Sequence, residues 1–426
     1  MPKLIASSSA GQRFPRPWNR YHPPVSSPQP AGQHTVRRHN SALVLNAIAD
    51  PSGHSRAEIA ARTGLTKATV SSLVDRMIGA NLVVEGAAAI RPGPGRRGTA
   101  LFLAPGGPHG LGVEIGVDYL ATCLIDLTGE VRARWLQSAD NRAMSPARVL
   151  SRVAKAVRTA LAEAERMGVR VGGMGVAVPG LVESATGILR VAPNLGWREV
   201  DVRGELSRRA GLHDIPVLVG NEANFAALAE LWQGTGPRDF VHVSGEIGIG
   251  AGIVVDGGLF EGVFGFGGEI GHMVVDPRGP RCACGSRGCL ERMAGQEEIL
   301  RQAGVLDDRE PEELVADLLE RLANHDRKAL TAVRNAAKSL GAALSGVINL
   351  LDLPAVVLGG TYARLAPWLW EPLRAELTQR VVSSEWSPIE VIASTLGSEA
   401  AVHGAAGSAV RAILADPDPY ITAVLA

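Results

Sequence analysis

The hydrophobic pattern of the chain begins at Thr35, because residues 1–33 are rich in Pro, Ser and Gly and lack apolar periodicity. A segment of that composition cannot bury enough apolar surface to offset the entropy of ordering, so residues 1–33 are predicted to form a disordered tail. From Thr35 onward, apolar residues recur at helical spacing and predict a helix that ends at the turn of residues 50–53. Its apolar face is predicted to consist of Leu43, Val44, Ala47 and Ile48.

Two further helices are predicted directly behind the first. Ser55 and Glu58 have the spacing of a capping box, so the second helix should run from Arg56 to Thr63. A third helix should follow Thr66 as its N-cap and extend to about residue 80. The apolar positions of this third helix, which are expected to face inward, are Val70, Leu73, Val74 and Met77. Helix, short turn and helix together predict a helix-turn-helix motif.

A basic, glycine-rich loop follows the helix-turn-helix. Residues 82–85 and 99–103 are predicted strands, and the loop between them has the composition of a wing. The whole of residues 34–104 is therefore predicted to be a winged helix-turn-helix domain. In such domains the second motif helix enters the major groove, while a basic wing contacts phosphates or the minor groove. The candidate DNA-binding residues are Lys67, Thr69, Ser71, Arg91, Arg96 and Arg97.

The distribution of charge favours DNA over the alternative, a protein-docking module of the same architecture. The chain has 43 basic and 43 acidic residues, but residues 1–104 contain thirteen Lys and Arg against four Asp and Glu. That segment carries a net charge of +9 and the remainder carries −9. Such asymmetry is expected of a nucleic-acid-binding module joined to a second functional unit. The arginines before residue 33 are interpreted as part of a solvated tail or of an overextended start of the reading frame, and contact with DNA is the alternative.

Beyond a linker at residues 104–108, the pattern changes to buried strands. Strands are predicted over residues 111–116, 119–127, 130–137 and 171–178, with helices over 146–167 and 225–232. Strands, a crossover helix and another strand open a ribonuclease-H-type α/β half of the actin-like kind. The strand pattern returns at residues 240–243 and 248–255, which predicts a second half and a cleft between two lobes. This α/β domain is expected to span residues 110–412, followed by a C-terminal extension at 413–426.

Four residues with metal-binding side chains lie close together in the second half. His272, Cys282, Cys284 and Cys289 supply one imidazole and three thiolates, the ligand set of a closed tetrahedral structural zinc site. The alternative is a set of incidental cysteines in a reduced protein. Three of the four cysteines of the chain lie within eight residues, so we predict a structural Zn²⁺. The spacing lacks the two separated ligand pairs of zinc fingers.

The same stretch resembles the signature of the ROK family, named for repressors, open reading frames and sugar kinases. The matching runs are GEIGH at residues 268–272 and CACGSRGCLE at residues 282–291, and residues 193–197 and 219–224 are similar to further sugar-site segments. The resemblance implies a two-lobed sugar kinase fold in which the histidine also ligates zinc. It implies that the effector-binding residues are Asn194, Asn221, Glu222, Glu269, His272 and Glu291. The N-terminal region is likewise similar to that of ROK-type repressors.

The phosphate-binding motifs depart from those of the kinases of the family. The general base, an Asp in the kinases, corresponds to Glu222, whose extra methylene displaces the carboxylate by about 1 Å. The first phosphate loop contains Glu114 and Asp118, and the second contains Glu246 where the kinases carry glycine and Ile247 where they carry threonine. Added negative charges should repel a polyphosphate. We therefore expect no ATP cofactor and no kinase activity.

The sugar-binding residues of the family are retained, whereas the phosphate-loop motifs are altered. This combination indicates a receptor. We expect a cytoplasmic transcriptional regulator, a repressor, that binds operator DNA and a monosaccharide or sugar phosphate. A homodimer or homotetramer is expected, because helix-turn-helix proteins usually read two half-sites. The alternatives are an active ATP-dependent sugar kinase with a DNA-binding domain, and a ROK domain that docks a membrane transporter protein. No apolar run is long enough to cross a bilayer, and the N-terminus lacks a signal peptide pattern.

Overall fold

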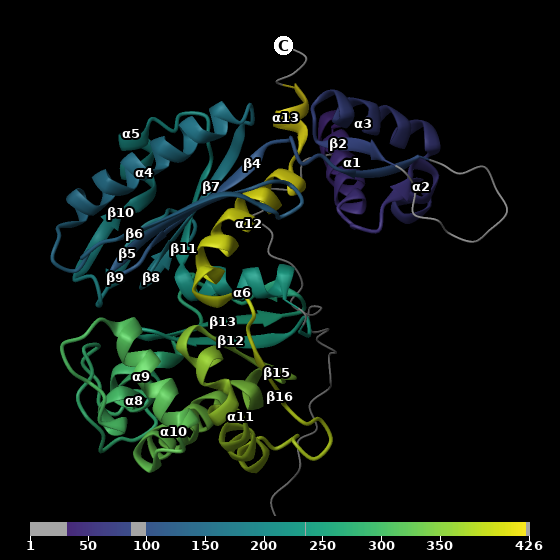
Figure 1. Cartoon of the computed structure of the whole chain (residues 1–426). Helices are drawn as coiled ribbons and strands as arrows, with labels where there is room; N and C mark the ends of the chain where they lie inside the picture. Colours follow the sequence, from purple (N-terminus) through teal and green to yellow (C-terminus); the bar gives the residue numbers. More distant parts are fainter. Residues whose placement is uncertain (1–31, 87–98, 235, 423–426) are drawn as a thin grey trace, which may run out of the picture.

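The computed structural model describes residues 32–86, 99–234 and 236–422 (Figure 1). Residues 1–31 of the predicted tail, and the wing residues Arg91, Arg96 and Arg97, lie outside this part of the chain. Within it, no helix is both long and apolar enough to span a lipid bilayer.

The N-terminal domain is a winged helix-turn-helix. Its helices are α1 (Gln33–Ile48), α2 (Arg56–Thr63) and α3 (Lys67–Gly79), and its strands are β1 (His54–Ser55), β2 (Val83–Gly86) and β3 (Ala100–Leu103), paired in the order β1-β3-β2. Ser55 and Glu58 form the predicted capping box, and the Thr66 hydroxyl accepts from the Thr69 N–H at 3.1 Å. The four predicted inward positions of α3 are all buried. The local capping and turn signals therefore give the correct helices.

One residue predicted on the buried face of α1 is wrong, whereas Val44 and Ile48 are buried and Ala47 packs against the core as predicted. Leu43 was expected on the buried face of α1 but is 38% exposed, whereas its neighbour at position 45 is fully buried. Val44, Leu45 and Ile48 form the inward face, because α2, α3 and the C-terminal segment pack on that side of α1. Periodicity alone did not distinguish two faces that differ by one residue.

The predicted linker is a hydrogen-bonded turn. The Ala104 N–H donates to Leu82 O at 3.0 Å, and the Gly107 N–H donates to Ala104 O at 3.0 Å. The Asn81 amide also donates to Gly106 O at 2.5 Å. The DNA-binding domain is therefore joined to the rest of the chain by a tight connection.

The first lobe is built on a mixed five-stranded sheet in the order β11-β7-β4-β5-β6. Its strands are β4 (His109–Ile115), β5 (Tyr119–Ile125), β6 (Val131–Ser138), β7 (Val171–Val178) and β11 (Val217–Asn221), and α4 (Pro146–Arg166) and α5 (Val202–Ala210) lie beside it (Figure 1). A small unpredicted sheet, β8 (Leu181–Glu183), β9 (Ile188–Ala192) and β10 (Trp197–Asp201), is inserted between β7 and α5.

The second lobe repeats this topology in the order β14-β13-β12-β15-β16. Its strands are β12 (Phe240–Gly245), β13 (Ile249–Val255), β14 (Gly258–Leu259), β15 (Ala355–Gly359) and β16 (Glu390–Ala393). Its helices include α7 (Leu290–Ala294), α8 (Gln296–Ala303), α9 (Pro311–Ala323), α10 (Arg327–Leu351) and α11 (Gly360–Arg380). In both sheets three antiparallel strands are followed by two parallel ones. The predicted pair of ribonuclease-H-type halves is confirmed.

Two helices pack against each other where the lobes meet, and the second of them also contacts the N-terminal domain. Helix α6 (Glu222–Gln233) begins at Glu222, earlier than predicted, and packs against β13 and α12 (Ala400–Ala415). Helix α12 lies against β4 and β7 so closely that a Cβ on Gly112 would stand 2.2 Å from Val402 O. A helix can approach a sheet this closely only where the strands carry glycine.

The C-terminal end of α12 reaches the DNA-binding domain (Figure 1). The Asn46 amide of α1 donates to Leu414 O at 3.0 Å, and Arg38 forms an ion pair with Asp416. Helix α13 (Asp418–Thr422) packs against α3. Residues of α1, α3, β5, α12 and α13 share a single apolar core. The segment predicted as a C-terminal extension thus contributes to the packing between the two domains.

Candidate metal centre and interlobe cleft

The three cysteines and the histidine singled out in the sequence converge in space. The ligand atoms of His272, Cys282, Cys284 and Cys289 all lie within 4.8 Å of one another. Cys284 Sγ is 3.6 Å from Cys289 Sγ, and Cys282 Sγ is 3.8 Å from His272 Nδ1. Two thiolates bound to one zinc at about 2.3 Å in tetrahedral geometry would lie about 3.8 Å apart. The group can therefore hold a metal ion, and its spacing fits tetrahedral zinc.

Tight turns bring these ligands together. Gly285 and Gly288 have φ angles of 95° and 65°, which L side chains rarely adopt. A Cβ on Gly288 would stand 1.5 Å from Asp276 O, so no other residue fits this position. Burial raises the pKa of Cys289 to about 12, whereas the Ser286 N–H lowers that of Cys284. A bound cation would stabilise all three thiolates.

His272 links the metal centre to the interlobe cleft. Its Nδ1 faces the thiol of Cys282, while its Nε2 is 3.9 Å from Glu269 Oε2. A metal bound at Nδ1 would hold the ring in one orientation and leave Nε2 directed toward the cleft. The metal centre can therefore position a cleft residue.

The cleft is a cavity of about 1750 Å³ between the two lobes. The backbone at Gly248 passes between two lining side chains, since a Cβ there would stand 2.7 Å from Glu291 Oε2 and 3.0 Å from Asn194 Nδ2. The predicted effector-binding residues that line this one cavity are Asn194, Asn221, Glu222, Glu269, His272 and Glu291. The structure thus brings all six together.

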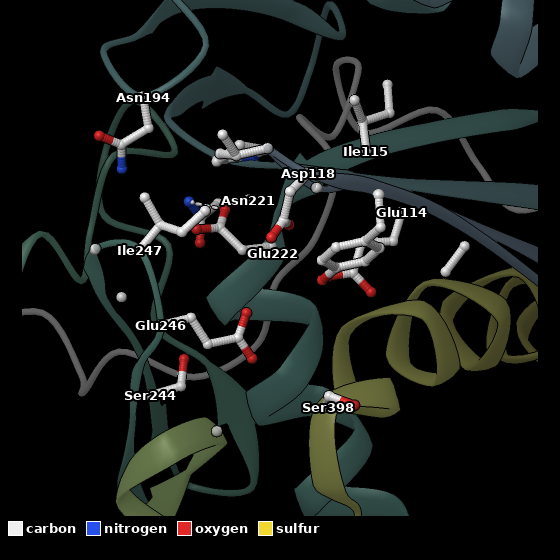
Figure 2. A pocket seen from close by; sticks show the side chains of 18 of the residues that line it. Glu114, Ile115, Asp118, Asn194, Asn221, Glu222, Ser244, Glu246, Ile247 and Ser398 are labelled. Carbon is white, nitrogen blue, oxygen red and sulfur yellow. Dashed lines mark hydrogen bonds between the residues drawn. The ribbon is translucent and has the colours of Figure 1, made fainter. Parts of the chain in front are cut away.

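Asn221 is already engaged by protein atoms. Its Oδ1 accepts from the N–H groups of Ala223 and Asn224 at 2.8 and 3.2 Å, which makes it the N-cap of α6. Its Nδ2 donates to Gly180 O at 3.1 Å and to Glu222 Oε2 at 2.8 Å (Figure 2). This side chain orients Glu222, while the Glu222 carboxylate retains capacity to accept from a ligand.

The phosphate-loop positions form an acidic side of the cavity (Figure 2). Glu114 is 5% exposed and accepts from the Tyr119 hydroxyl at 2.5 Å. Burial raises its pKa to about 8, and the nearby carboxylate of Glu246 adds to the effect. Desolvation and Asp118 likewise raise the pKa of Glu246. Desolvation and neighbouring carboxylates raise the pKa of Glu222 well above its usual value. Desolvation and mutual repulsion thus favour the protonated forms of these three carboxyl groups.

Tyr119 was not anticipated as a cleft residue. Its ring lies 2.4 Å from the position of a Cβ on Gly116, the glycine of the first phosphate loop. The ring therefore covers one side of the backbone that phosphate would have to approach. A tyrosine directly after this loop was the available sequence signal.

Basic side chains also line the cavity. Arg134 of β6 pairs with Glu399 at 3.0 Å, and His403 Nε2 is 3.7 Å from the same carboxylate. Arg364 of α11 pairs with Glu312 at 2.8 Å. Sequence reasoning missed these residues, because they come together only through the packing of α12 and α11 around the cleft.

The fold and the cleft define a two-lobed sugar-kinase-like domain joined to a winged helix-turn-helix. The ROK family matches residues 110–411 and the MarR family matches residues 38–89, and the chain belongs to the ROK family. It is 30% identical to the xylose repressor of Bacillus subtilis over 376 residues, which cover 88% of this chain and 95% of that protein.

Two solved structures are similar. A ROK family transcriptional regulator, described as a homologue of the MLC protein of E. coli, superposes with a TM-score of 0.77 and 25% identity, covering 91% of this chain and 98% of that one. A ROK family glucokinase from Streptomyces griseus, in complex with glucose and AMPPNP, gives a TM-score of 0.61 and 28% identity, covering 71% of this chain and 99% of that one.

Proposed function

We propose that this protein is a DNA-binding transcriptional repressor whose ROK domain binds a sugar effector in the interlobe cleft. The observation that carries the proposal is the course of α12. Val402 and His403, near its first residues, line the cavity, while Leu414 near its last residues is hydrogen-bonded to α1 of the DNA-binding domain. A ligand that changes the cleft therefore acts on a helix packed against the DNA-binding domain.

The comparisons support a regulator over an enzyme. The similarity to the xylose repressor and to the ROK regulator extends over both domains. The similarity to the glucokinase covers 71% of this chain and 99% of the glucokinase chain. The acidic residues Glu114, Asp118, Glu222 and Glu246 further oppose phosphoryl transfer. The effector is a monosaccharide or a sugar phosphate, and D-xylose is the first candidate.

The proposed effector contacts come from both lobes. Asn194 and Glu222 would bond hydroxyls from the first lobe, and Glu269, His272 and Glu291 from the second. Carboxylates accept from vicinal hydroxyls, and an imidazole held by a metal donates in a fixed direction. We further propose that the metal is Zn²⁺ in a structural role, a proposal supported by the ligand set and the spacing of the ligand atoms.

The proposed DNA contacts are on α3 and the wing. Lys67 is exposed, and Thr69 and Ser71 are half-buried on the N-terminal half of α3. Together with the wing arginines they would bind operator DNA in the cytoplasm, with two or four copies of the chain reading paired half-sites. Sugar binding would shift the relative placement of these domains only to the extent that it favours one arrangement over the other.

Calorimetric titration of the metal-loaded protein with pentoses, hexoses, amino sugars and their phosphates tests the proposal. DNA binding is measured in parallel by fluorescence anisotropy, with DNA from upstream of the coding sequence of this protein. An ATP-consumption assay measures kinase activity. A sugar that binds, releases DNA and causes no ATP turnover supports the repressor. Glu269→Gln with Glu291→Gln should abolish binding, whereas Glu165→Gln, on the exposed side of α4, should not. ATP turnover would establish a kinase instead, and no sugar binding would refute the sensor.

A further inference from the structure

Three carboxylates stand beside the proposed sugar site. Glu114, Asp118 and Glu246 come from the two former phosphate loops and line the same cavity as Glu222 (Figure 2). We refer to Glu114, Asp118 and Glu246 as the acidic wall. Its members are close enough to affect one another, since Asp118 raises the pKa of Glu246 and Glu246 raises that of Glu114. The wall thus borders the point where a kinase would hold the transferred phosphate.

No basic side chain of the described residues forms an ion pair with the acidic wall. The cavity-lining arginines that form ion pairs do so elsewhere, Arg134 with Glu399 and Arg364 with Glu312. A phosphate site normally provides Arg, Lys or a helix N-terminus. The N-terminus of α11 does open onto this cavity, but Glu246 already lies against it, since a Cβ on Gly360 would stand 3.2 Å from Glu246 Cγ.

Glu114 gives an independent indication of the same environment. Its side chain is 5% exposed and lines the cavity, and no side chain among the described residues donates to its Oε2. A buried carboxyl oxygen without a donor is costly unless the group is protonated. Glu114 is therefore favoured in its neutral form, which can bond a sugar hydroxyl but supplies no positive charge to offset a phosphate.

The residues of the acidic wall do not form a metal site whose cation could attract a phosphate. Among the described residues, the group whose ligand atoms converge for a metal ion is the His272 and cysteine cluster, and no member of the wall belongs to it. A divalent ion bridging the wall to a phosphate would require the carboxylates to rearrange.

We propose, building on the function proposed above, that the acidic wall makes the effector site selective for an unphosphorylated sugar. A sugar hydroxyl can donate to a carboxylate and accept from a protonated carboxyl, so it suits the wall in either protonation state. A phosphate ester brings one to two negative charges and no donor in its dianionic form. Glu114, Asp118 and Glu246 therefore exclude sugar phosphates, as well as the phosphates of nucleotides.

The test compares each free sugar with its own phosphate ester. D-glucose and glucose 6-phosphate, N-acetyl-D-glucosamine and its 6-phosphate, and D-xylose and xylose 1-phosphate are titrated into the metal-loaded full chain, with DNA release measured in parallel. Wild type should bind the free sugar of the recognised pair at least ~100-fold more tightly, a difference of about 2.7 kcal/mol at 1.36 kcal/mol per tenfold. Asp118→Asn with Glu246→Gln should reduce that ratio at least ~10-fold, whereas Glu165→Gln should leave it as in wild type.

Several outcomes overturn the inference. Wild type could bind an ester more tightly than the free sugar, the double variant could keep the wild-type affinity ratio of free sugar to ester, or added Mg²⁺ could restore ester binding. Each of these results would show that the wall is not the selective element, while the protein would still be a sugar-responsive repressor. If neither member of any pair binds or releases DNA, the proposed function fails and the inference fails with it. Because the ratio is measured within one folded variant, a general loss of stability does not imitate the expected result.

Discussion

Replacing Glu114 with Gln should change how stability depends on pH. Burial raises the pKa of this carboxyl from 4.5 to about 8. In the unfolded chain it ionises near pH 4.5, so between these two values the folded protein binds one more proton than the unfolded chain. Stability from Glu114 is therefore fully present below pH 4.5 and is lost as pH rises toward 8. Each pH unit in that window is worth up to about 1.4 kcal/mol, or about 5 kcal/mol in all.

Glu114→Gln removes this titration while nearly preserving side-chain volume and the acceptor for Tyr119. The stability of the variant relative to wild type should thus increase as pH rises from 5 to 8. The assay is urea unfolding of metal-loaded protein at several pH values, followed by tryptophan fluorescence and compared by midpoint, because a two-domain chain need not unfold in one step. Glu165→Gln is the matched exposed control. A midpoint difference between Glu114→Gln and wild type that stays constant across this range would refute the argument from burial.

Four further outcomes follow from the packing and the metal centre. Gly112→Ala should destabilise the protein by about 1–3 kcal/mol, because a Cβ there meets the backbone of α12; chemical unfolding measures this. Leu45→Ala should cost about 2–5 kcal/mol, whereas the exposed neighbour, Leu43→Ala, should cost less than about 0.5 kcal/mol, and equal costs would contradict the assigned face of α1. Cys284→Ser should lower zinc content and weaken sugar binding, as measured by metal analysis and calorimetry, and retained zinc with full affinity would argue against the metal centre. Asp416→Ala should change stability by less than about 1 kcal/mol yet reduce the effect of sugar on DNA affinity in anisotropy titrations, since its ion pair with α1 is largely exposed.

Local chemistry in the sequence was sufficient for several elements. A capping box needs only Ser55 and Glu58 at their spacing, and the metal cluster needs only thiols and an imidazole on one glycine-rich stretch. The alternation of strands and helices likewise predicted two ribonuclease-H-type halves. In these cases the interacting groups are close along the chain, so their arrangement depends little on the rest of the molecule.

Contacts between distant segments were decided only by the tertiary structure. Periodicity did not reveal that Leu45 rather than Leu43 is buried, because the C-terminal segment packs on one side of α1. The sequence showed that Glu114 replaces a kinase residue, but its raised pKa arises from burial and from Glu246, more than a hundred residues away. Burial and local dielectric depend on every segment that surrounds a group. For that reason the sequence by itself identified the candidate effector-binding residues of the cleft. Only the assembled fold decided the charge of these residues, their hydrogen-bond partners and their connection through α12 to the DNA-binding domain.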